Sequence, residues 1–179
     1  MTSTPSDDIL LQRTRRRILE YLAGHPGVSA REVQRALQLG WGETAYHLDQ
    51  LVRANAAQRE RTGRRDAYFA PNVPWTDRRI LVVLRGGTTR RLLLELTSVP
   101  AIGFSDLQAR LGVSKSTLSF HLTRLVAAGL VEVLRTDEGR SYRVPSRERV
   151  AQLVRAYRES FGDRLIGRFI ETWTSLLPE

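Results

Sequence analysis

The chain has 179 residues, of which 41% are hydrophobic, and a formal net charge of +9, so it can bury a core sufficient for two small domains or one of medium size. The absence of cysteine excludes disulfides, thiolate catalysis and cysteine-ligated zinc or iron–sulfur sites. The three histidines lack the HxxxH or HExxH spacing of metalloenzymes, so we expect no metal, cofactor or catalytic site. The longest apolar run, residues 80–84, is far shorter than the roughly 20 residues of a membrane span, which predicts a soluble, cytoplasmic protein with no membrane partner.

An internal repeat determines the predicted domain organisation. Residues 33–71 align with residues 107–145 at a constant offset of 74 and without a gap, and 11 of these 39 positions are identical. Chance alone would give roughly two identities over this length, so one structural unit occurs twice. We therefore expect a first domain over residues 1–73 and a second, with a connecting helix, over residues 74–145.

The first copy shows the pattern helix, helix, helix, hairpin. Residues 14–23 predict the first helix, and Ser29 with Glu32 three residues later predicts a capping box at the start of the second. A turn over residues 39–42 separates the second helix from the third. A hairpin across residues 61–65 completes the copy.

The second copy repeats this order. Its first helix is expected over residues 89–96, and its second begins at Ser105, with Gln108 in the position of a capping box. The third helix starts at Ser114 and is stopped by Gly129, after which a strand, a turn and a second strand follow.

Two helical segments are expected outside the repeat. Residues 77–85 predict a short connecting helix, although the apolar run ILVVL would also fit a strand. Residues 146–179 carry an apolar stripe at helical spacing, which predicts one long C-terminal helix. Such a helix covers its apolar face either by folding back on its own domains or by pairing with a second subunit. We expect a homodimer, with an interface formed by Leu153, Tyr157, Phe161, Leu165, Phe169, Trp173 and Leu176.

The third helix of each copy presents an outer face that suits double-stranded DNA. In a helix-turn-helix, two helices pack so that the outer face of the second can enter the major groove. In the second copy this face is basic or neutral and rich in short hydroxyls, which suit phosphate oxygens and base edges. Its candidate DNA-binding residues are Lys115, Ser116, Thr117, Ser119, Phe120, Thr123 and Arg124.

The equivalent face of the first copy is less favourable to phosphate. Its candidates are Trp41, Tyr46, Gln50 and Arg53, and two carboxylates, Glu43 and Asp49, lie beside them. An acid in a recognition helix can accept a hydrogen bond from cytosine, but a weaker role or one without DNA is the more common explanation. We therefore expect the second copy to supply most of the affinity for DNA.

Arginines gather on both hairpins. Arginine supplies 27 of the 28 basic residues, and it suits bidentate contacts with phosphate, although a GC-rich genome also raises its number. Arginines on a hairpin fit the minor groove or the flanking backbone, and a solvated turn is the alternative. Asp137 and Glu138 reduce the positive charge of the second hairpin. The candidates are Arg61, Arg64 and Arg65 in the first copy and Arg135, Arg140 and Arg143 in the second.

The segments WGETAYHLDQLVRA and SKSTLSFHLTRLVAAGLVE resemble the recognition helices of ArsR-like winged helix regulators. Two such units followed by a helical tail are similar to the tandem winged helix-turn-helix regulators common in archaea. The resemblance implies a mainly α fold with small β-hairpins (α+β), in which the hairpins are wings and the tail dimerises. The sequence departs from the pattern at residues 55–57, where Asn-Ala-Ala replaces the Gly-Leu-Val of the second copy, and the cysteines of metal-sensing ArsR proteins are absent.

These features predict a nucleoid-associated, sequence-specific transcriptional regulator that is not an enzyme. Two alternatives are an architectural protein that coats DNA without reading bases and a winged helix module that binds proteins. His47 and His121 lie at the edge of the apolar face of each third helix, where we expect them to pack and to bond a backbone or phosphate group rather than to act in catalysis. The sequence assigns no small-molecule effector.

Overall fold

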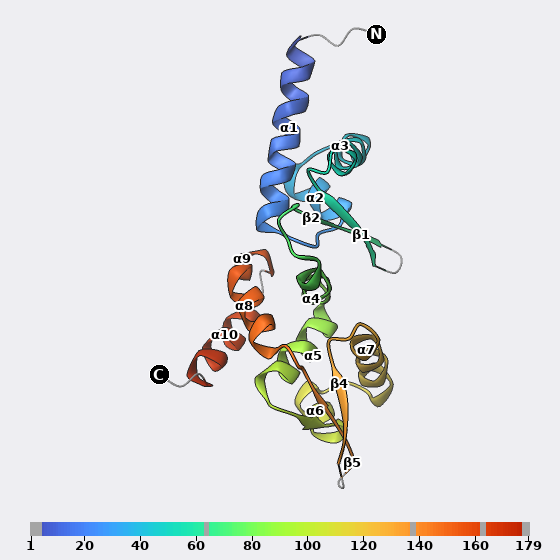
Figure 1. Ribbon diagram of the computed structural model, residues 1–179, viewed down its shortest axis with the longest axis vertical. Helices are drawn as coiled ribbons and strands as arrows, with labels where there is room; N and C mark the ends of the chain where they lie inside the picture. The colour runs from blue at the N-terminus through green and yellow to red at the C-terminus, as the bar shows by residue number, and fades with distance from the viewer. Residues whose placement is uncertain (1–4, 63–64, 137–138, 162–163, 177–179) are drawn as a thin grey trace. The chain divides into compact units, whose positions relative to one another are not determined.

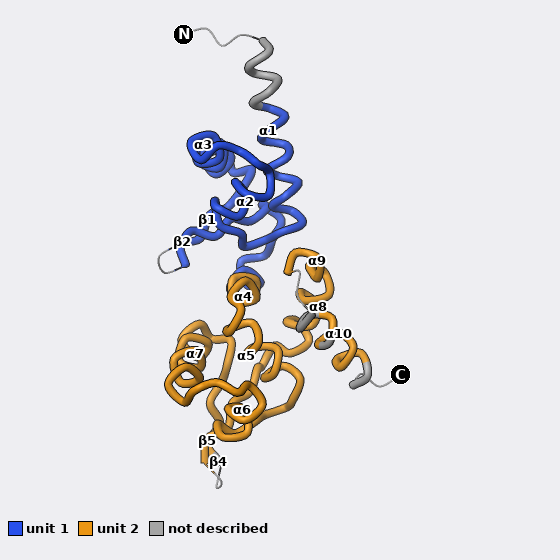
Figure 2. The backbone as a smooth tube through the Cα atoms, turned by 180° about the vertical axis from the view of Figure 1, so that it is seen from behind, with its two compact units in different colours: residues 1–78 blue, residues 79–179 orange. Residues whose placement is uncertain are grey.

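The computed structural model describes residues 5–62, 65–136, 139–161 and 164–176. The chain separates into two compact units, residues 1–78 and residues 79–179 (Figure 2). Each unit contains one copy of the repeat, folded as three helices and an antiparallel hairpin, which confirms the predicted α+β fold. The domain limits predicted from the sequence, at residues 73 and 145, differ from this division into units and stay a prediction.

Unit 1 packs three helices on a two-stranded hairpin (Figure 1). Its elements are α1 (Pro5–Gly24), α2 (Ala30–Leu37), α3 (Trp41–Arg53), β1 (Gln58–Thr62) and β2 (Arg65–Phe69). An isolated bridge between Val28 and Tyr68 adds a third strand position beside β2. The core collects apolar side chains from every helix and from the hairpin, namely Ile18, Leu22, Val28, Val33, Leu48, Leu51, Ala57 and Tyr68.

Local hydrogen bonds set the limits of the helices in unit 1. The capping box is confirmed, because Ser29 Oγ accepts from the backbone N–H of Glu32 at 3.4 Å and the carboxylate of Glu32 accepts from the backbone N–H of Ser29 at 2.8 Å. Gln38 ends α2 in the left-handed conformation with φ 56°, and α3 starts at Trp41, so the turn lies slightly earlier than predicted. Asn55 is also left-handed, with φ 55°, a conformation that asparagine tolerates, and it follows the end of α3.

Unit 2 repeats this arrangement with a fuller sheet. Its elements are α5 (Gly87–Ser98), β3 (Ile102–Gly103), α6 (Phe104–Leu111), α7 (Lys115–Ala127), β4 (Glu132–Thr136) and β5 (Gly139–Arg143). The strands form an antiparallel sheet in the order β3-β5-β4. Leucines from α5, α6 and α7 are fully buried and form the core, namely Leu92, Leu93, Leu96, Leu107, Leu118 and Leu125.

The start of α6 corrects one prediction. Its N-cap is Gly103 rather than Ser105, because β3 delivers the chain to the helix in an extended conformation. Gln108 therefore lies too far into the helix for a capping box, and its side-chain amide donates instead to the carbonyl of Val113 at 3.2 Å. The start of α7 is as predicted, with Ser114 as its N-cap.

The connecting segment is the helix α4 (Trp75–Arg85), which excludes the strand alternative. The tail differs from the single long helix expected, since it forms α8 (Arg147–Ala156), α9 (Arg158–Phe161) and α10 (Arg164–Leu176). Tyr157 leaves the helical conformation, with ψ 25°, at the end of α8. This break lets the chain reverse, so that α10 packs against α5 and α8 of its own unit. Across the described ranges, no helix has the length and apolar character needed to cross a membrane.

Candidate nucleic-acid interface

Helix α7 has one buried side and one side open to solvent. Leu118, Leu122 and Leu125 are buried and anchor the helix, which packs against α5. Val126 is exposed, because it lies one residue further around the helix than Leu125. The predicted DNA-binding residues of α7 lie on the open side, where Thr117 is half-buried and the others are exposed, namely Lys115, Ser116, Ser119, Phe120, Thr123 and Arg124.

The hydroxyl groups on α7 fall into two sets. Ser114 Oγ accepts from the backbone N–H of Thr117 at 3.2 Å, donates to Thr117 Oγ1 at 2.8 Å and lies 3.0 Å from Ser116 Oγ. These three hydroxyls therefore stabilise the N-terminus of the helix. Ser119 and Thr123 make no hydrogen bond through their side chains to other described residues, so their hydroxyls are available to a ligand.

The positive charge of α7 is not compensated within the helix. The segment KSTLSFHLTRLVA contains no acidic residue. The guanidinium of Arg124 lies over the ring of Phe120, 5.6 Å from its centroid, and Phe120 is 57% exposed. Among the residues that the structure describes, Arg124 has no ion pair. The face of α7 thus combines two cations, Lys115 and Arg124, with an exposed aromatic ring.

The equivalent face of α3 is neutralised by its own acids. Arg53 Nε lies 2.7 Å from a carboxylate oxygen of Asp49, one helical turn away. Such an exposed pair contributes little to stability, but it occupies the guanidinium that would otherwise meet a phosphate. Gln50 is half-buried, and Glu43 lies 3.5 Å from the hydroxyl of Thr14 on α1.

Two aromatic side chains stand out on α3. Trp41 and Tyr46 are each about half exposed. The guanidinium of Arg31, from α2, lies 5.5 Å from the centroid of the Trp41 ring. Arg31 was not among the residues predicted to bind DNA. Because the first helix of a helix-turn-helix crosses the DNA backbone, exposed arginines on α2 belong among the candidates.

The register of the β4–β5 hairpin brings like charges together. Arg135 and Arg140 are directly opposite each other and exposed. Like charges at opposed positions repel, so an anion beside them would stabilise this arrangement. Arg143 differs, because its Nε lies 2.8 Å from a carboxylate oxygen of Glu132. Asp137 and Glu138 lie outside the described residues.

The β1–β2 hairpin carries fewer described candidates. Arg61 is exposed and lies opposite Asp66, while Arg65 is exposed and lies opposite Thr62. Arg64 lies outside the described residues. In this hairpin the positive charge of Arg61 is therefore partly balanced by Asp66 on the facing strand.

Both histidines of the repeat face inward. His47 is buried, and no described residue hydrogen-bonds its Nδ1. Burial and, to a smaller extent, the positive charge of Arg15 lower the pKa of His47. His121 Nδ1 lies 3.1 Å from the hydroxyl of Thr89, so its partner is a side chain rather than the backbone or phosphate expected. Burial and then Arg124 lower the pKa of His121.

The predicted dimer residues of the tail lie largely inside unit 2. Leu153, Phe161, Phe169 and Trp173 are buried, and Tyr157 is half-buried. The side chains of Leu165 and Leu176 lie outside the described part of the chain. The apolar stripe is thus covered, within the described residues, by the chain's own helices, which was the alternative to a dimer.

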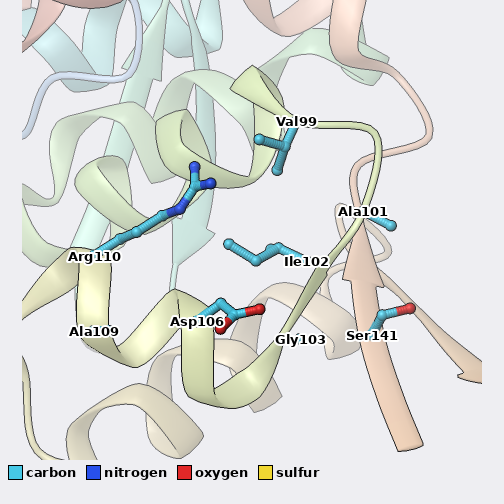
Figure 3. Close-up of a pocket in the computed structure, with 8 residues that line it drawn as sticks. All are labelled: Val99, Ala101, Ile102, Gly103, Asp106, Ala109, Arg110 and Ser141. Atoms are coloured by element: carbon cyan, nitrogen blue, oxygen red, sulfur yellow. The ribbon is translucent and has the colours of Figure 1, made fainter. Parts of the chain in front are cut away.

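Unit 2 also contains a cavity of about 600 Å³ (Figure 3). It lies between α6, strand β5 and the segment that leads into β3. Asp106 and Arg110, one turn apart on α6, line it together with the apolar side chains of Val99 and Ile102. None of its lining residues comes from α7, so this cavity is separate from the candidate interface.

Comparison with known proteins gives each half of the chain a helix-turn-helix match. Residues 12–81 match a family described as an N-terminal HTH domain, and residues 87–133 match a family described as a helix-turn-helix domain. An uncharacterized HTH-type transcriptional regulator of Methanocaldococcus jannaschii is 26% identical over 126 residues, which are 70% of this chain and 32% of the relative. This chain therefore spans about a third of the relative's length. Each unit has a winged helix-turn-helix fold, and each half of the chain matches a helix-turn-helix family. The chain therefore carries two helix-turn-helix domains in tandem, as tandem helix-turn-helix transcriptional regulators do.

Proposed function

We propose that the chain is a sequence-specific transcriptional regulator that binds double-stranded DNA. Helix α7 enters the major groove, and the hairpins contact the flanking backbone or the minor groove. The observation that carries this proposal is the contrast between the two equivalent helix faces. Arg124 on α7 has no ion pair among the described residues, whereas Arg53 on α3 is paired with Asp49.

The charge of the two units supports the same ranking. Residues 79–179 contain 16 basic and 10 acidic residues, while residues 1–78 contain 12 basic and 9 acidic residues. Attraction to phosphate supplies the sequence-independent part of DNA binding. Unit 2 therefore contributes more of the affinity for DNA, and α7 contributes most of the sequence preference.

Unit 1 has features of a protein-binding surface as well. Trp41 and Tyr46 are exposed beside Arg31, and residues of these three types are enriched among the energetically important contacts of protein interfaces. A winged helix module that binds a protein through α3 is thus a second candidate for unit 1. It is compatible with DNA binding by unit 2.

We also propose a homodimer, which forms in a different way from the dimer predicted from the sequence. Because Trp173 and Phe169 are buried within the chain, a dimer through the tail forms by exchange of α10 between two subunits. Two α7 helices would then meet one duplex, and the binding site would be an inverted repeat. Light scattering at micromolar concentration tests it, and a monomer there would rule it out.

Two double variants test the ranking of the helices. Lys115→Ala with Arg124→Ala removes both cations of α7, and Gln50→Ala with Arg53→Ala is the comparison on α3, which removes one cation. We expect the first pair to weaken binding to DNA strongly and to flatten the log–log salt dependence by about 0.9 for each of the two cations that contacts a phosphate. We expect the second pair to have a smaller effect, because Arg53 is already paired. Equal losses in fluorescence anisotropy at one salt concentration would contradict the ranking.

The same assay separates the functional alternatives. A duplex selected from host genomic fragments and a random duplex of equal length are compared across salt concentrations. A large preference for the selected duplex supports the regulator. A steep salt dependence without preference would indicate an architectural protein, and no binding to either would indicate a protein-binding module.

A further inference from the structure

We propose that Phe120 and Arg124 together recognise a thymine and a neighbouring guanine in the major groove. The ring of Phe120 contacts the 5-methyl group of the thymine, and the guanidinium of Arg124 donates to N7 and O6 of the guanine. This inference rests on the proposed function, since it requires α7 to enter the groove.

The fold gives no reason for the exposure of Phe120. Leu118, Leu122 and Leu125 already anchor α7 in the core, and a 57% exposed phenylalanine on the opposite side adds nothing to that packing. Aromatic side chains, phenylalanine included, are enriched in the contact surfaces of proteins relative to the rest of the surface. In the major groove, the 5-methyl group of thymine is the apolar feature on the base edges, and phenylalanine is among the side chains that contact it.

The neighbours of Phe120 are short. Ser116, Ser119 and Thr123 lie four residues before, one before and three after it, so they border the ring on the helix surface. Phe120 and Arg124 therefore extend further from the central part of α7 than the side chains between them. A helix that approaches base edges would bring these two side chains into contact first.

The stacking of Arg124 on Phe120 prepares the guanidinium for a base. The guanidinium carbon lies 5.6 Å from the ring centroid, and within the described part of the chain no carboxylate pairs with it. Stacking holds the guanidinium plane while its N–H groups remain free to bond an acceptor pair such as guanine N7 and O6. The distance of 5.6 Å between the guanidinium carbon and the ring centroid lies between one and two base-pair steps of about 3.4 Å, so the two groups can reach neighbouring base pairs.

The first copy does not duplicate this pair. The positions equivalent to Phe120 and Arg124 are Tyr46 and Gln50, and Asp49 stands where α7 has Thr123. The amide of Gln50 carries no charge, and the carboxylate of Asp49 repels phosphate. Tyr46→Ala is therefore a matched control, because it removes an exposed aromatic ring from the equivalent position without touching α7.

Base analogues test each contact separately. A duplex selected by the full-length protein is remade with one thymine replaced by deoxyuridine, which removes the methyl group, or one guanine replaced by 7-deazaguanine, which removes the N7 acceptor. At one thymine we expect the native protein to lose roughly fourfold in affinity, the effect of about one buried methyl group. At the neighbouring guanine we expect a loss of about tenfold, within the range for bidentate guanine contacts.

The variants assign these losses to side chains. In Phe120→Ala the deoxyuridine penalty should disappear, in Arg124→Ala the 7-deazaguanine penalty should disappear, and Tyr46→Ala should keep both. Circular dichroism confirms that the variants are folded. A native protein insensitive to deoxyuridine at every thymine would overturn the inference, as would a penalty that persists in Phe120→Ala. If the native protein binds no duplex at all, the proposed function itself fails, and the inference fails with it.

Discussion

Replacing Trp173 with alanine tests whether α10 stabilises the chain to which it belongs. Trp173 is 7% exposed, its ring stacks on that of Phe169 with centroids 5.9 Å apart, and the guanidinium of Arg147 lies 5.3 Å from its centroid. Arg147 is itself held by a hydrogen bond of 2.8 Å from its Nε to the carbonyl of Thr97 at the end of α5. Trp173 thus helps to join the tail to the core of unit 2.

The size of the effect follows from the buried area. Burying a tryptophan removes about 150–250 Å² from water. At about 25 cal/mol per Å², this corresponds to roughly 4–6 kcal/mol as an upper value. Truncation of buried tryptophan or phenylalanine to alanine typically costs about 3–5 kcal/mol. We therefore expect Trp173→Ala to lower the free energy of unfolding of unit 2 by about 3–5 kcal/mol.

Urea unfolding followed by circular dichroism, at low and high micromolar protein concentration, measures this change. Trp75→Ala is the control, because Trp75 is 68% exposed and its loss should change stability by less than about 0.5 kcal/mol. Equal effects of the two substitutions would refute the burial of Trp173. If the unfolding midpoint of the native protein rises with concentration and that of Trp173→Ala does not, a second subunit rather than the same chain covers the ring.

Two further predictions concern charge. Because burial, with help from Arg15, lowers the pKa of His47 below its ordinary value of about 6.5, the unfolded chain takes up a proton that the folded chain does not. The contribution of His47 to the stability of unit 1 should therefore be fully present above about pH 6.5 and decline as the pH falls from there toward the pKa of the folded state. In urea unfolding between about pH 5 and 8, His47→Gln should remove this dependence of stability on pH. An unchanged pH dependence in the variant would contradict the prediction. On the β4–β5 hairpin, Arg135→Gln with Arg140→Gln should relieve the repulsion between the two arginines. The double variant should lower the affinity for all duplexes alike and flatten the salt dependence of binding by roughly two log–log units. A loss of affinity confined to the selected duplex would show that the hairpin reads sequence.

Local chemistry in the sequence predicted the three helices and the hairpin of each copy of the repeat. The capping box of Ser29 and Glu32, the N-cap Ser114 and the left-handed Gly129 depend on residues a few positions apart, so the sequence contains all the partners needed. The α7 face was predictable for the same reason, because helical periodicity separates Leu118 and Leu122 from the outer residues. The spacing of Asp49 and Arg53 also permitted an ion pair one turn apart, which the structure contains.

Contacts between distant residues decided the remainder. The apolar run in α4 has no period that separates helix from strand, and its helical state goes with the burial of Leu81 and Leu84. The tail shows an apolar stripe in either arrangement, folded back or paired with another subunit. Its periodicity indicates that the apolar face must be covered, but α5, which covers part of it, lies far away in the sequence. A helical pattern depends only on the chain's own repeat of about 3.6 residues, whereas the partner of an apolar face depends on which surfaces the tertiary fold brings together.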